Sequence, residues 1–264
     1  HAPMGEYGHN SAEGLHTLIE AKKLAYADLA LRVCDPAFHD VPADAMLSKA
    51  YAAKRFSEID LDRAHPGVSP GVMPKGSDTT YISTVDRDGN MVSLIQSNFA
   101  GFGSGLVAGG TGFALQCRGG LFTMDASHVN ALAPRKRPLH TIIPGLMTGG
   151  GRRIAFGIMG GWNQAQAHVQ FVSNIVDHGM NIQEALEAAR VTKLTFSGCD
   201  VLMESRVPVS SRLALTAKGH QIDLQGAFSN MVGGGQSVMR DYAAGVNYGA
   251  SDPRKDGAAI PEPL

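Results

Sequence analysis

The residues most able to do chemistry lie where a connector meets a β-rich segment. Thr79 and Thr80 follow the stretch HPGVSPGVMPKGS at 65–77, which holds three Pro and three Gly and so neither continues a helix nor pairs fully as a strand. A Thr hydroxyl becomes a useful nucleophile when a base lies beside it, and chain cleavage before Thr79 would supply the residue's own α-amine as that base. The alternative is that two threonines are simply good strand composition, and the pattern alone does not decide.

A glycine pair is the second candidate for chemistry. Gly160 and Gly161 end the motif GIMGG, between an expected strand at 152–156 and an expected helix from Asn163. Backbone amides at the start of a helix bind anions, so these two could hold the charged oxygen of an acyl-transfer intermediate. Close packing of strand against helix through Gly is an equally simple explanation.

Other motifs argue against nucleotide or metal chemistry. The motif GFGSG at 101–105 is followed by VAGGTGFALQ instead of a clean helix, and no P-loop Lys-Ser/Thr occurs. The pairs His9 with His16 and His128 with His140 lack the helical spacing of metal ligands, so no metal site is expected. His140 precedes an expected strand and could face a site, although a lone His is more often satisfied by hydrogen bonding elsewhere.

Composition excludes several classes of partner. The 264 residues carry a net charge of -1 and are 44% apolar and 18% charged, which suits a globular chain with a sizeable core. No basic footprint for nucleic acid or anionic membrane is present. No apolar run approaches the roughly 20 residues of a membrane-spanning helix. The three cysteines form neither a CxxC pair nor a zinc spacing, and we expect inert thiols.

The elements expected to position these residues are helices at both ends of the chain and strands between them. Apolar periodicity predicts helices at about 12–29, 43–56, 163–177, 181–189 and 211–218. A hairpin is predicted at 79–97, where Asp88-Gly89 marks the turn, and another near 235–252. Further short strands are expected among the Gly-rich turns from 101 to 161. Strands flanked by blocks of helices indicate a layered α/β or α+β sandwich.

Six segments of the sequence form a recognisable series: DTTYISTVDRDGN at 78–90, FGSGLVAGGTG at 102–112, NALAPRKRPLHTIIP at 130–144, GIMGG at 157–161, GGGQSV at 233–238 and YGASDPRKDGAA at 248–259. They occur in the order typical of the γ-glutamyltranspeptidase family, which this sequence resembles. The resemblance implies an α+β chain with the four-layer αββα sandwich of the Ntn-hydrolases, lacking most of the large subunit. Residues 1–78 correspond to the mainly helical end of that subunit, with an exposed linker at 65–78, and 79–264 to the small catalytic subunit.

The same resemblance implies roles for individual residues. Thr79 matches the nucleophile, released by autoproteolysis of the Asp78–Thr79 bond, and Ser97 matches a hydroxyl residue that assists its amine. Gly160 and Gly161 match the pair that holds the oxyanion. The implied reaction transfers a γ-glutamyl group from glutathione or a similar amide to Thr79, then to water or an amino acid acceptor. No metal or organic cofactor is implied, and the implied protein partner is a large-subunit segment upstream of His1, where any export signal would also lie.

The expected substrate site departs from the family pattern. An Asn, an acidic pair and two adjacent Ser are replaced here by Phe99, by Gly120 with Leu121, and by His140 with Thr141. The acidic partner that family members offer to a free α-amine is thus absent, and Arg118 and His140 could instead meet a carboxylate. The alternatives are therefore a related acylase acting on glutaryl, β-lactam side-chain or poly-γ-glutamyl amides, and an inactive or unprocessed fragment.

Overall fold

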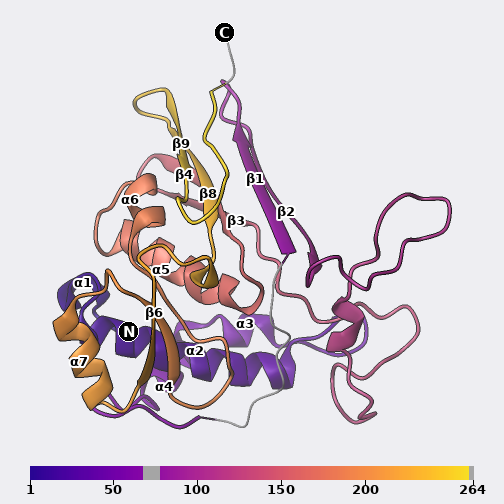
Figure 1. The fold of residues 1–264 in the computed structure, drawn as a ribbon, viewed down its shortest axis with the longest axis horizontal. Coiled ribbons are helices and arrows are strands. Elements are labelled where there is room, and N and C mark those ends of the chain that lie inside the picture. The colour runs from indigo at the N-terminus through magenta and orange to yellow at the C-terminus, as the bar shows by residue number, and fades with distance from the viewer. Residues whose placement is uncertain (68–77, 262–264) are drawn as a thin grey trace.

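The computed structural model describes residues 1–67 and 78–261, and its first segment is helical (Figure 1). Ser11 caps the long second helix by accepting a hydrogen bond from the amide of Gly14, as its sequence predicts. The single helix predicted at 43–56 is divided, because Ser48 leaves the helical conformation and caps a new helix by accepting from the amide of Tyr51. The four helices are α1 (Met4–Tyr7), α2 (Ala12–Arg32), α3 (Ala43–Met46) and α4 (Lys49–Phe56).

A four-stranded antiparallel sheet, in the order β3-β4-β8-β9, forms the centre of the second segment. Its strands are β3 (Gly145–Gly149), β4 (Arg152–Ile158), β8 (Gly235–Asp241) and β9 (Val246–Ser251). Two helices, α5 (Gln164–Val176) and α6 (Ile182–Glu187), cover one face (Figure 1). Their apolar side chains share a core with alternate residues of β4, namely Ile154, Phe156 and Ile158.

The opposite face of β4 packs against a hairpin of β1 (Asp78–Val85) and β2 (Met91–Phe99). Gly157 makes this approach possible, because a Cβ there would collide with the ring of Tyr81. Tyr81, Ile95 and Met159 form a small buried cluster with Ile142 beside it, which we call the hairpin cluster. Helices, sheet and hairpin thus make three successive layers.

A smaller sheet joins the two segments. Its strands β5 (Val191–Thr192), β6 (Asp200–Glu204) and β7 (Gln221–Gln225) lie in that order, and α7 (Val209–Ala217) connects the parallel pair β6 and β7. Side chains of α2 and α7 enclose a core with this sheet, including Leu15, Ile19, Val201, Met203 and Leu215. Residues 1–67 are therefore packed into the same body as the strands.

The prediction of short strands between 101 and 144 is wrong for most of that range. Within it the structure has two isolated bridges, Val107 with Ala114 and Thr123 with Ala131, and the short 3-10 helix η1 (Arg118–Leu121). Five glycines from Gly101 to Gly112 have positive φ, which turns the backbone out of the extended conformation. The remaining 3-10 turns are η2 (Gly161–Asn163) and η3 (Asn230–Val232).

The α+β class expected from the sequence is confirmed. Among the described residues, no helix combines the length and the apolar character that crossing a lipid bilayer requires.

Candidate active site

Thr79 and Ser97 are direct partners across the β1–β2 hairpin. The Thr79 hydroxyl donates a hydrogen bond to Ser97 Oγ at 3.0 Å. The register of the hairpin is irregular between Asp78 and Thr79, so the strand pairing changes at the bond expected to be cleaved. Thr79 is buried, whereas Thr80 is exposed. Of the two threonines, Thr79 is the one whose hydroxyl lies inside the protein.

Among the described residues, three donors lie within hydrogen-bond distance of Ser97 Oγ. Besides the Thr79 hydroxyl, these are the amide of Phe99 at 2.9 Å and Nη2 of Arg118 at 3.0 Å. Phe99 ends β2 with a φ of 78°, an uncommon conformation for a bulky residue, and it folds the chain so that its amide meets Ser97. The end of β2 is thus shaped around one serine hydroxyl.

Arg118 connects this serine to a distant segment of the chain. Its guanidinium is buried, and Nη1 donates to the Thr141 hydroxyl at 2.9 Å. The guanidinium also lies over the ring of Phe99, 4.7 Å from the ring centre. Burial lowers the pKa of Arg118. Five of the eight predicted site residues, Thr79, Ser97, Phe99, Arg118 and Thr141, are therefore joined by direct contacts.

His140 lies beside this group but differs from Thr141 in environment. Thr141 is buried and His140 is exposed. The pKa of His140 is nevertheless lowered, first by partial desolvation of its ring and then by the charge of Arg118. The neutral imidazole is favoured, so His140 adds little positive charge to the site.

Gly160 and Gly161 form the turn between β4 and η2, with φ values of 135° and 58°. A non-Gly residue is strained in both conformations. Met159, the residue before the turn, packs in the hairpin cluster with Tyr81, two residues beyond Thr79. The glycine turn and the start of β1 therefore both adjoin the hairpin cluster. The contacts described above do not join either glycine to Thr79.

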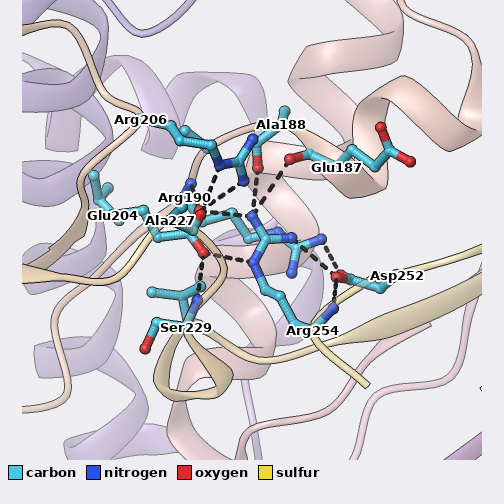
Figure 2. A network of polar contacts seen from close by, with 12 residues as sticks. Glu187, Ala188, Arg190, Glu204, Arg206, Ala227, Ser229, Asp252 and Arg254 are labelled. Atoms are coloured by element: carbon cyan, nitrogen blue, oxygen red, sulfur yellow. Dashed lines mark hydrogen bonds and ion pairs between the residues drawn. The ribbon is translucent and has the colours of Figure 1, made fainter. Parts of the chain in front are cut away.

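A network of arginines and carboxylates lies in the interior beside α6 and β6 (Figure 2). Arg190, Glu204, Asp252 and Arg254 are all buried, and Arg190 Nη2 and Arg254 Nη1 both pair with the Asp252 carboxylate. Arg190 Nη1 donates to the carbonyl of Gly233 at 3.0 Å, and the carbonyl of the next residue accepts from the amide of Met159 at 2.9 Å. No local pattern predicted this network, because Asp252 and Arg254 stand in the polar segment ASDPRKDG.

Comparison with known proteins gives the context of this geometry. The family model for γ-glutamyltranspeptidase matches residues 1–262. The chain belongs to the γ-glutamyltranspeptidase family. It is 37% identical over 258 residues to the glutathione hydrolase-like YwrD proenzyme of Bacillus subtilis, covering 96% of this chain and 48% of that relative. The chain thus spans about half the length of the curated relatives it matches.

Two solved structures extend the comparison. The crystal structure of cephalosporin acylase from Bacillus halodurans is 40% identical, with a TM-score of 0.85 over 98% of this chain and 47% of that chain. The γ-glutamyltranspeptidase of Pseudomonas nitroreducens is 28% identical, with a TM-score of 0.59 over 70% of this chain and 100% of that chain. The family resemblance and the Ntn-hydrolase fold expected from the sequence are confirmed, and this γ-glutamyltranspeptidase-family chain holds part of that fold.

A second polar cluster lies outside the candidate site of this family member. His16, Glu20 and His220 are buried, and their ligand atoms lie within 4.8 Å of one another. The two imidazoles share a hydrogen bond of 2.7 Å, and Lys23 donates to Glu20 at 2.7 Å. These contacts tie α2 to the segment after α7, and the buried Nδ1 of His220 has no hydrogen-bond partner among the described residues. The two histidines are 204 positions apart in the chain, so no local spacing predicted the cluster.

Proposed function

We propose that this chain carries the catalytic machinery of an amide hydrolase and acyltransferase in which Thr79 is the nucleophile. Family membership and the named relatives support an enzyme that hydrolyses γ-glutamyl or other acyl amides. The observation that carries the proposal is the position of Thr79. This residue is buried at the start of a strand, and its hydroxyl donates a hydrogen bond to Ser97 Oγ. A threonine in this place gains its own base when the preceding bond is cut.

In the proposed reaction, cleavage of the Asp78–Thr79 bond first frees the α-amine of Thr79. The amine takes the proton of the hydroxyl as Oγ1 attacks the carbonyl carbon of the amide, and Ser97 holds Oγ1 in place. The amides of Gly160 and Gly161 bind the oxygen that becomes negative. The amine leaving group departs with the proton, and water or an amino acid acceptor then takes the acyl group from Oγ1.

The proposal divides the chain at the same bond. Residues 1–78 would be the end of the large subunit and residues 79–264 the small subunit. The linker at 65–78 lies mostly outside the described residues. The match to the Pseudomonas nitroreducens chain supports this division. It covers 100% of that chain but 70% of this one, and residues 79–264 make up a similar share of this chain. The proposed partners are the upstream part of the large subunit and a small γ-glutamyl compound such as glutathione.

The nucleophile is tested by comparing two neighbouring threonines in the full-length proenzyme. Thr79→Ala is expected to abolish both chain cleavage and turnover of an acyl anilide. Thr80→Ala, at an exposed position on the same strand, is the matched control and is expected to leave cleavage intact. Intact mass and the N-terminal sequence of the small subunit give the answer. If the Thr79→Ala protein is cleaved and the Thr80→Ala protein is not, Thr80 is the nucleophile. If the wild-type protein is not cleaved, the alternative of an unprocessed fragment is favoured.

A second candidate function is the same chemistry applied to an acyl group other than γ-glutamyl. The similarity to a cephalosporin acylase favours it, as does Phe99, whose ring lies under a guanidinium at the expected substrate site. Anilides of γ-glutamate and of glutarate separate the two candidates, because these acyl groups differ only in the α-amine.

A further inference from the structure

A tyrosine of the N-terminal helical segment contacts the backbone directly beside the glycine turn. Tyr26 lies in α2, is buried, and donates a hydrogen bond from its hydroxyl to the carbonyl oxygen of Trp162. Trp162 is the residue that follows Gly161 in the chain. This hydrogen bond therefore runs from residues 1–67 to the turn whose amides are proposed to bind the oxyanion.

The ring of Tyr26 is held by its neighbours, independently of the hydroxyl. It stacks on the ring of Phe196 with the centres 5.1 Å apart, and it meets the ring of Trp162 edge to face at 6.2 Å. The ammonium of Lys22 lies 4.0 Å from the centre of the Tyr26 ring. Burial raises the pKa of the Tyr26 hydroxyl, so this group stays protonated at neutral pH and remains a donor. The turn thus receives one fixed donor from α2.

The geometry of the turn explains why a contact at Trp162 bears on the amide of Gly161. The amide of Asn163 donates to the carbonyl of Gly160 at 3.0 Å and closes the 3-10 turn η2. In a trans peptide the carbonyl and the N–H point to opposite sides, so the N–H of Gly161 points away from the bond that holds the Gly160 carbonyl. Its direction depends on where residues 161–163 lie, and the Tyr26 hydroxyl holds the middle residue of that turn.

The Tyr26 contact crosses the proposed cleavage site. By contrast, the bond from the Asn163 side chain to the carbonyl of Val232 lies within residues 79–264. We propose that Tyr26 is a positioning residue for the oxyanion turn, so that the chemistry of the small subunit depends on a hydroxyl from the helical segment before the cut. This inference rests on the proposed function of Thr79 and the glycine pair, and adds the dependence of their site on residues 1–67. Because Tyr26 acts through the backbone of Trp162, loss of its hydroxyl should lower kcat and leave KM unchanged.

The experiment compares two tyrosine variants of the mature full-length protein with γ-glutamyl and glutaryl p-nitroanilide. Tyr26→Phe keeps the ring and removes the contact to the turn. Tyr51→Phe is the matched control, because the Tyr51 hydroxyl donates to Asp28 at 2.9 Å within the same helical segment. We expect Tyr26→Phe to lower kcat by about 10-fold, less than the loss of an oxyanion donor itself, and by the same factor for both anilides, because every acyl group forms the same oxyanion. Tyr51→Phe is expected to keep the wild-type kcat.

The outcomes separate this inference from the function on which it rests. An unchanged kcat in Tyr26→Phe, with the wild-type protein active, overturns the role of Tyr26 and leaves the nucleophile assignment standing. A rise in KM without a fall in kcat overturns it as well, and so do equal losses in the two tyrosine variants. An absence of all turnover, with Thr79 uncleaved, overturns both proposals.

A second variant decides if Tyr26→Phe does not fold. Phe196→Leu keeps the Tyr26 hydroxyl and removes the ring on which Tyr26 stacks. Because the hydroxyl is then held less firmly, kcat should fall several-fold with KM unchanged. A wild-type kcat in Phe196→Leu would contradict the proposal.

Discussion

A single hydroxyl organises the candidate site at the scale of residues. Ser97 Oγ contacts the Thr79 hydroxyl, the Phe99 amide and the Arg118 guanidinium, so the proposed nucleophile and a buried guanidinium share one hydrogen-bond acceptor. A change at any of these four residues alters the hydrogen bonds left to the others. Their effects on turnover should therefore be non-additive when they are combined.

Gly161 provides a sharp test of the oxyanion turn. Gly161→Ala places a Cβ on a residue with φ of 58°, and Gly150→Ala does the same at φ of 55° in the open turn between β3 and β4. Each costs about 1–2 kcal/mol of backbone strain. Displacing an oxyanion amide is expected to lower kcat by about 10²-fold, so Gly161→Ala should lose turnover and Gly150→Ala should not. Similar kcat values for the two variants would remove Gly161 from the site.

Sequence patterns and the family resemblance named the residues expected in the candidate site but not their contacts. The strand start at Thr79 and the glycine pair follow from local composition, and the roles of Ser97 and Arg118 entered through family resemblance. The bond from Arg118 to Thr141 depends on how the irregular segment 100–144 folds back onto the hairpin. Positive-φ glycines set that path, and their local pattern suggests turns without giving the direction of each turn.

At the scale of elements, the positions of helices and hairpins were predicted closely, whereas the buried ion pairs that hold these elements together were not predicted. Apolar periodicity located α2, α5 and α7 to within a few residues, because each packs apolar side chains into a core. No sign of the buried network of Arg190, Glu204, Asp252 and Arg254 is present in the sequence, because its ion pairs join residues that are far apart in the chain. Polar residues in a core are specified by their three-dimensional partners and not by a period.

The network yields a stability prediction. Arg254→Met removes a guanidinium that contacts Glu204 at 2.6 Å and Asp252 at 3.0 Å, all with side chains shielded from water. Both carboxylates lose a buried partner, so the free energy of unfolding should fall by about 3–5 kcal/mol. The matched control is Arg152→Met, which breaks an ion pair whose arginine side chain is 58% exposed and should cost about 0–1 kcal/mol. Urea unfolding measures both, and equal losses would contradict a supporting role for the network.

At the scale of the whole molecule, the proposed cleavage would leave two pieces that remain packed together. Contacts from residues 1–67 to the later segment include Lys22 with the carbonyl of Thr195, Asn130 with the carbonyl of Val33, and the buried imidazole pair of His16 and His220. They join a shared apolar core. The cut protein should therefore elute as one species under native conditions and give two bands on a denaturing gel.

The association of the two pieces should weaken in acid. Burial lowers the pKa of His220 to about 3, with repulsion from His16, Lys23, Lys193 and Lys218 adding to the effect. A separated, solvated His titrates near about 6.5, so the joined state binds this proton less tightly than the separated state. By linkage, its contribution to association is complete above pH 6.5 and declines as the pH falls toward 3.

Size-exclusion chromatography of the cleaved protein in increasing urea tests this linkage at pH 7.5 and pH 5. The urea concentration that separates the pieces should be lower at pH 5. His220→Gln, which cannot take up a proton in this range, should reduce the difference between the two pH values, and His39→Gln, at an exposed position, is the control. If His220→Gln leaves the pH difference unchanged, His220 is not its cause and another buried group is. Lys22 is then the next residue to replace, because burial lowers its pKa to about 6.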